Sequence, residues 1–167
     1  MDIIIQSNLK TLNKTKTLLS NLTNEELSNN SVSPYYSSIG SHIRHILDIY
    51  DCALRVNSEN KIDLTDRKRN TDVEIKCESA LQYLNQIIDK LKNIDIASGD
   101  NIIVIDDLGL GKIEMQYTYE ALMTQANSHT IHHHAIINCI LEQLNISVND
   151  ETFGYNPTTP RPEINLN

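Results

Sequence analysis

The sequence has few of the residues that interrupt helices. It contains five glycines, four prolines and no tryptophan, and Pro34 is the only proline before residue 157. Proline in a helix interior removes a hydrogen bond and clashes with the preceding turn, so its scarcity leaves long stretches free to form helices. With a single phenylalanine, the core must be built mainly from isoleucine and leucine.

Positive charge is also scarce. Fourteen Lys and Arg stand against 22 Asp and Glu, giving a formal net charge of −8. The one dense basic run is "DRKR" at 66–69, and proteins that bind nucleic acid usually carry a basic face or stripe. We therefore predict no nucleic-acid partner.

Cysteine pairs and long apolar runs are missing as well. Cys52, Cys77 and Cys139 are odd in number and form no CxxC motif, which is typical of reduced thiols in a cytosolic protein. No stretch approaches the ~20 apolar residues that a membrane span needs, and "MDIIIQSNLK" lacks the basic start of a signal peptide. These features predict a cytoplasmic protein with no membrane segment.

Helical periodicity dominates what is present. It predicts an all-α fold, a four-helix bundle with a small β-hairpin before the last helix, as one domain over 1–167 with an irregular tail at 150–167. The predicted helices cover about 5–19, 38–56, 66–93 and 119–144, and the predicted hairpin strands cover 102–106 and 112–117. "TNEE" at 23–26 predicts a capping box that opens a short extra helix.

Four of the six histidines occur in "SHTIHHHAII" at 128–137. Residues four apart on a helix lie nearly above one another, so His129 and His133 share the apolar face and form the i, i+4 pair that offers two imidazoles to one metal. His132 flanks this pair by about 60°, whereas His134 lies about 140° away, so we expect it to face outward. A third ligand must come from a facing helix, where His42 and His45 remain.

Two rival metal chemistries lack their residues. A zinc protease of the HExxH type needs glutamate after its first histidine, and Thr130 stands there. Di-iron bundles need Glu-x-x-His motifs, and the sequence has none. A mononuclear histidine site fits the pattern, and the competing interpretation is a set of neutral core histidines that bind no metal.

Two segments carry a resemblance to a known family. "SSIGSHIRHILDIYDCAL" at 37–54 and "SHTIHHHAII" at 128–137 resemble the second and last helices of the DinB/YfiT-like superfamily, which is unrelated to the DNA polymerase of the same name. The resemblance extends over nearly the whole chain. It implies metal ligands at His45, His129 and His133. One departure is Glu120-Ala121, where the family would have an Arg-Glu pair.

The resemblance also implies the chemistry. Members are four-helix proteins with a bound metal, commonly Zn or Ni and sometimes Fe, and are frequent homodimers. Characterised relatives are thiol-dependent enzymes, so we expect a metal-dependent S-transferase or hydrolase that acts on a small molecule with a low-molecular-weight thiol. The alternative is a non-catalytic dimeric bundle that binds metal or a small ligand in a structural or storage role.

Further residues are candidates for supporting roles. Asp48 lies one helical turn from His45 and can orient it through the second ring nitrogen. His42 and His132 are candidates for second-shell groups near the metal, able to act as acid or base. Arg67 and Arg69 are candidates for a patch that receives an anionic thiol cofactor. The competing interpretation of these residues is ordinary packing or solvent exposure.

Overall fold

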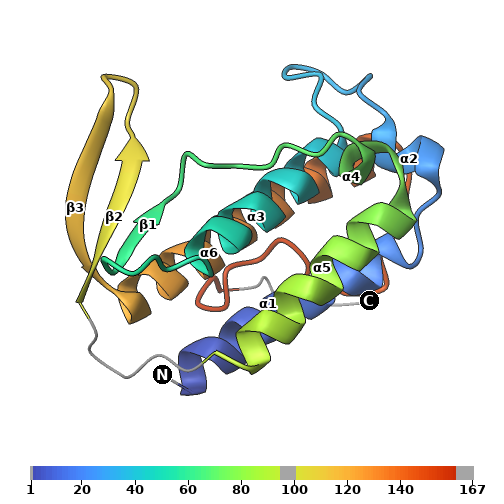
Figure 1. Cartoon of the computed structure of the whole chain (residues 1–167). Helices are drawn as coiled ribbons and strands as arrows, with labels where there is room; N and C mark the ends of the chain where they lie inside the picture. Colours follow the sequence, from blue (N-terminus) through green and yellow to red (C-terminus); the bar gives the residue numbers. More distant parts are fainter. Residues whose placement is uncertain (1, 95–100, 161–167) are drawn as a thin grey trace.

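The computed structural model describes residues 2–94 and 101–160 of the chain. These residues form six helices and three strands (Figure 1). In chain order they are α1 (Asp2–Leu19), α2 (Asn24–Ser28), α3 (Ile39–Ala53), β1 (Lys61–Asp63), α4 (Asp72–Ile75), α5 (Cys77–Lys92), β2 (Asn101–Asp107), β3 (Lys112–Thr118) and α6 (Tyr119–Gln143). The predicted irregular tail has turns but no helix or strand over 150–160, and its remainder, 161–167, lies outside the described residues.

The predicted all-α four-helix-bundle class is wrong, because a three-stranded mixed sheet accompanies the helices. The strand order is β1-β2-β3, with β1 parallel and β3 antiparallel to β2. The hairpin of β2 and β3 was predicted, whereas β1 was not. That strand has three residues and a single apolar side chain, Ile62, so it carries no detectable alternation. The chain is therefore a mixture of α and β structure.

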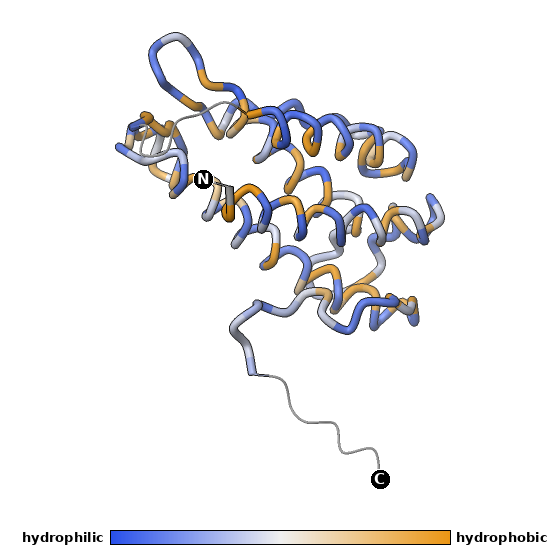
Figure 2. Tube along the Cα trace, turned by 90° about the horizontal axis from the view of Figure 1, so that it is seen from below, coloured by the Kyte–Doolittle hydropathy of each residue, from blue (hydrophilic) through white to orange (hydrophobic). Residues whose placement is uncertain are grey.

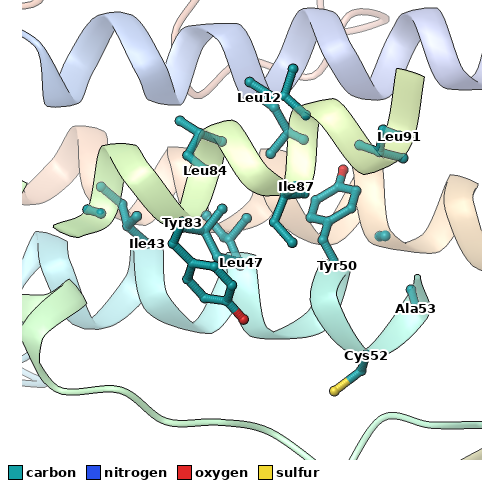
Figure 3. Packing of buried hydrophobic residues seen from close by; sticks show 14 of the residues in the cluster. Leu12, Ile43, Leu47, Tyr50, Cys52, Ala53, Tyr83, Leu84, Ile87 and Leu91 are labelled. Carbon is teal, nitrogen blue, oxygen red and sulfur yellow. The ribbon is translucent and has the colours of Figure 1, made fainter. Parts of the chain in front are cut away.

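The four long helices enclose the core. α1 and α3 each pack against both α5 and α6, and hydrophobic positions recur turn by turn along the helices (Figure 2). Figure 3 shows side chains from three helices meeting in this core: Leu12 of α1, Ile43 and Leu47 of α3, and Leu84 and Ile87 of α5. α6 thus faces α1 on one side and α3 on another, which matters for its histidines.

Local sequence signals explain where the helices begin. Thr23 and Glu26 form the predicted capping box of α2. The Ser38 side chain accepts a hydrogen bond from the Ser41 backbone N–H at the start of α3, and Thr118 does the same for Ala121 at the start of α6. Each cap satisfies an N–H group that has no partner within its helix.

The third predicted helix begins later than expected. Residues 66–71 are not helical, α4 has a single turn, and Lys76 adopts extended backbone angles (φ −130°, ψ 113°) before α5 begins at Cys77. Arg67 and Arg69 consequently lie on an irregular segment between β1 and α4. The prediction failed because the apolar spacing continues across the break at Lys76.

The sheet lies at the end of the molecule where α3 ends and α6 begins (Figure 1). At its hairpin, Gly109 and Gly111 have φ of +94° and +105°, and their N–H groups donate to the Asp107 carboxylate. Because a positive φ favours glycine, these two residues stabilise this conformation of the turn. β3 then leads directly into α6, which packs against it.

Candidate metal centre

His129 and His133 lie one turn apart on α6. Their ring centroids are 4.5 Å apart, and the two Nε2 atoms are separated by 3.0 Å. This convergence follows from the i, i+4 spacing, since helix side chains lean toward the N-terminus and stack over the preceding turn. The predicted pairing of the two rings is confirmed.

α3 brings a third imidazole to the same place. His45 Nε2 lies 2.9 Å from His129 Nε2, and one ring nitrogen from each of His45, His129 and His133 lies within 4.8 Å of the other two. Two imidazoles on a tetrahedral Zn²⁺ at about 2.0–2.1 Å place their nitrogens about 3.3 Å apart. The His45–His129 and His129–His133 nitrogen distances are within a few tenths of an ångström of this value, and the donor set fits a divalent metal.

The three rings are prepared to bind as neutral imidazoles. Burial, reinforced by neighbouring histidines and arginines, lowers the pKa of His45 to about 4, and burial together with the surrounding histidines lowers the pKa of His133 to about 3. Burial and His132 also lower the pKa of His129. Metal ligation requires unprotonated nitrogen, and at neutral pH each of these rings carries a single proton, so one of its two nitrogens is free to bind.

His42 contacts His133, one of the three candidate ligands, through its second ring nitrogen. Its Nδ1 lies 2.9 Å from Nδ1 of His133, and its Nε2 lies 2.8 Å from the Ser37 hydroxyl. When His133 uses Nε2 as a ligand, its Nδ1–H can donate to His42, whose Nε2–H then donates to Ser37. Such contacts fix ring orientation and tautomer at metal sites. Ser37 was missed as a partner because it precedes α3 and lies five residues before His42, a spacing that no helical pattern marks.

Arg67 contacts the second nitrogen of His45. Its Nη1 lies 3.3 Å from His45 Nδ1, and its Nε donates to the Leu64 carbonyl. Arginine has donors only, so this contact leaves the single proton of neutral His45 on Nε2. A metal could bind Nε2 only through its lone pair. The proton would then have to move to Nδ1, and the contact of Nδ1 with Arg67 would be lost. Arg67 therefore opposes metal binding at His45 through both its hydrogen bond and its charge.

Asp48, the predicted partner of His45, is engaged elsewhere. It is fully buried and accepts hydrogen bonds from Arg44 Nη1 (2.9 Å), Tyr83 Oη (3.2 Å) and the Arg69 backbone N–H (3.2 Å). One helical turn separates Asp48 from His45, yet these contacts point its carboxylate toward α5 and the 64–71 segment. Asp48 thus holds that segment against α3.

The other two histidines of α6 differ sharply in burial. His132 is exposed, with its ring centroid 5.3 Å from that of His133, and its side chain makes no hydrogen bond to another described residue. His134 was expected to face outward, and this was wrong. It is 1% exposed, hydrogen-bonded to Thr15 of α1 at 2.8 Å and stacked on Phe153. The reason is that α1 covers a second face of α6.

A cavity of about 170 Å³ lies on one side of the histidine cluster. His45 and His129 form one wall, and Arg67, Asp106 and Gln125 bring polar atoms to it. Arg69, the other predicted anion-binding residue, is exposed and does not line the cavity. Asp106 and Gln125 were missed from the sequence. Asp106 extends the inward-facing alternation of β2 after Ile102 and Val104, a signal visible only once the strand's register is known.

A larger cavity, of about 360 Å³, lies on the α1 side of α6. Lys14 and His134 line it, together with the segment after α6. Of the residues that the structure describes, His45, His129 and His133 form the one group of three or more that could hold a metal, and they do not line this cavity. The candidate metal centre therefore adjoins the smaller cavity.

The thiols do not contribute to the centre. Cys52 is buried, burial raises its pKa, and its Sγ lies 3.3 Å from the Asp66 carbonyl. Burial also raises the pKa of Cys77. A raised pKa disfavours the thiolate that nucleophilic attack needs.

In comparisons with known proteins, no family model matches the chain, and no curated protein matches it. Within residues 2–94 and 101–160, no helix is both long enough and apolar enough to cross a membrane.

Proposed function

We propose that the chain is a metal-dependent enzyme in which His45, His129 and His133 hold one divalent ion. The observation that carries the proposal is the approach of three imidazoles from two facing helices, with Nε2 atoms 2.9 and 3.0 Å apart. A site with three protein ligands leaves a coordination position for water or substrate, which is the pattern of catalytic zinc centres, whereas structural sites use four protein ligands.

The reaction that we propose is transfer or hydrolysis at a small-molecule substrate, with a low-molecular-weight thiol as the candidate co-substrate. A divalent ion held here supplies Lewis acidity, which lowers the pKa of a bound water or thiol. His42 keeps His133 oriented, and Arg67 and Asp106 present charge to the adjoining cavity. Zn²⁺ and Ni²⁺ are the ions that we propose, because imidazole suits both, and Fe is a further candidate.

The resemblance to the DinB/YfiT-like superfamily supports this proposal through the same three histidines. Homodimerisation is a proposal that rests on the resemblance alone, and cytoplasmic localisation is a proposal that rests on the odd number and wide spacing of the three cysteines. The alternative, a non-catalytic metal- or ligand-binding protein, shares the metal centre and differs only in the lack of turnover.

The test begins with untagged protein. Metal content is measured by mass spectrometry for wild type, His45→Ala and His129→Ala, with His134→Gln as a matched control whose ring lies on the α1 side of α6. Each sample is then assayed for ester hydrolysis and for thiol consumption with small electrophiles. We expect activity to follow metal content. Full activity in both chelated protein and His45→Ala would overturn the enzymatic proposal, and metal binding without any turnover would favour the alternative.

A further inference from the structure

The cavity beside the histidines is small and has mixed walls. At about 170 Å³ it lies below the about 300–1,000 Å³ typical of pockets for drug-sized ligands. Its apolar wall comes from α3, α6 and the first residue after β1: Ile49, Leu64, Leu122 and Ala126. The occupant must therefore be a small molecule with a short apolar part.

The polar wall carries two opposite charges that do not neutralise each other. Arg67 and Asp106 both line the cavity, yet no ion pair within 4.0 Å joins them. In the part of the chain that the structure describes, neither has any other oppositely charged partner at that distance, although Lys14, Arg44, Arg55 and several lysines do.

Hydrogen-bonding capacity remains on both groups. Arg67 donates from Nε to the Leu64 carbonyl and from Nη1 to His45, while its Nη2 makes no hydrogen bond to another described residue. Asp106 accepts at Oδ1 from the Asp107 backbone N–H, and its Oδ2 likewise has no partner among residues 2–94 and 101–160. Each charge can therefore receive a ligand group without breaking a protein ion pair.

Opposite charges on one small cavity select a ligand that carries both signs. A dianion would be repelled by Asp106, and a simple amine would be repelled by Arg67. A carboxylate next to an ammonium group satisfies both, with the carboxylate on the arginine fork. Because Arg67 also contacts His45, that carboxylate would lie beside the metal centre, and Gln125 offers a further amide to either end.

We infer that this cavity binds a small zwitterionic amino acid with a short apolar side chain, its carboxylate on Arg67 and its ammonium on Asp106. The inference rests on the proposed function in one respect: it names the substrate class of that metal centre. Binding itself depends on Arg67 and Asp106, not on the metal ligands, so it can be measured separately.

The experiment compares matched ligands by isothermal titration. L-Valine is tested beside 3-methylbutanoate, which lacks the amino group, and 2-methylpropylamine, which lacks the carboxylate; L-alanine is tested beside propanoate and ethylamine. Titrations use both zinc-loaded and metal-free protein. We expect at least one amino acid to bind at least tenfold more tightly than both of its matched ligands. If neither amino acid shows this preference in either form of the protein, the inference is wrong.

Variants locate the site. Arg67→Gln and Asp106→Asn should each weaken amino-acid binding at least tenfold, and Arg67→Lys should restore part of it. Arg69→Gln and Asp89→Asn change exposed charges away from the cavity and should bind as wild type does. Equal binding by wild type and Arg67→Gln would contradict the assignment, once thermal melting shows that each variant is folded.

Zinc affinity, measured on the same samples, separates this inference from the proposed function. If wild type binds zinc, His129→Ala does not, and no amino acid is preferred, the metal centre is supported and the amino-acid inference is wrong. If the amino acid is preferred but the protein binds no zinc, the amino-acid inference is supported and the proposed metal centre is wrong.

Discussion

His42 and His133 face each other through their Nδ1 atoms, 2.9 Å apart, and Ser37 lies 2.8 Å from the far nitrogen of His42. This chain connects a candidate metal ligand on α6 to a hydroxyl that precedes α3. It makes His42 a positioning residue for the centre without being a ligand itself.

Replacing His42 should therefore weaken metal binding without abolishing it. We expect His42→Ala to lower zinc affinity about 10- to 100-fold, the usual effect of removing a hydrogen-bond partner of a ligating histidine. Competition with a chromogenic chelator measures this. His132→Ala is the matched control, because His132 is exposed and lies outside this chain of hydrogen bonds. Equal losses in the two variants would show that the Ser37–His42–His133 chain has no special role.

Arg67 should have the opposite effect on the metal. Its contact holds the His45 proton on Nε2, and its charge repels a cation. We expect Arg67→Gln to raise zinc affinity several-fold, up to about tenfold, since glutamine has no charge and carries an acceptor oxygen that the Nδ1–H of ligating His45 can use. The same titration of Arg69→Gln should show no change. A lower zinc affinity in Arg67→Gln would contradict the opposition between Arg67 and the metal.

The stability of the metal-free protein should fall in mild acid. Burial and the nearby Lys14 lower the pKa of His134 to about 4, against 6.5 for an ordinary histidine. Between these values the unfolded chain binds a proton that the folded chain does not, so stability is retained above about pH 6.5 and declines toward pH 4. At about 1.4 kcal/mol per pKa unit, His134 alone accounts for about 3 kcal/mol.

Urea denaturation at several pH values tests this contribution. His134→Gln keeps an amide able to reach Thr15 but cannot titrate, so its stability should decline less steeply between pH 6.5 and 4 than that of wild type. The remaining slope in the variant comes from other histidines, among them His45 and His133, whose pKa values are also lowered. Parallel curves for the two proteins would mean that His134 is not the buried neutral group seen in the structure.

Gly40 should not tolerate a side chain. A Cβ at this position would lie 2.0 Å from the Glu74 carbonyl oxygen, where the start of α3 packs on α4. The clash is with backbone, so Gly40→Ala should cost about 1–3 kcal/mol of unfolding free energy. Thermal melting of Gly40→Ala measures the loss. Ser41→Ala is a neighbouring control that adds no atom, and a wild-type midpoint for Gly40→Ala would show that α4 can move away freely.

How much the sequence predicts depends on how local the signal is. The pairing of His129 and His133, the caps at Thr23 and Ser38 and the hairpin at Gly109 and Gly111 are set by residues within a few positions of one another. Each is visible as spacing or composition, and each is present in the structure.

The errors involve contacts between distant segments. β1 is too short to show alternation and exists because Ile62 pairs with Val104 of β2. His134 was expected at the surface because its angle was measured from one buried face, whereas α1 covers another. Arg67 and Asp106 meet at one cavity only because the segment after β1 and the end of β2 lie beside α3 and α6. None of these contacts between distant segments produces a periodic pattern in the sequence.

The most direct test of the metal centre is a zinc titration of metal-free wild type beside the triple variant His45→Ala, His129→Ala, His133→Ala and the His134→Gln control. One Zn²⁺ should bind per chain in wild type and in His134→Gln, and none with comparable affinity in the triple variant. Absence of tight binding in wild type, or undiminished binding in a folded triple variant, would contradict the assignment of these three histidines.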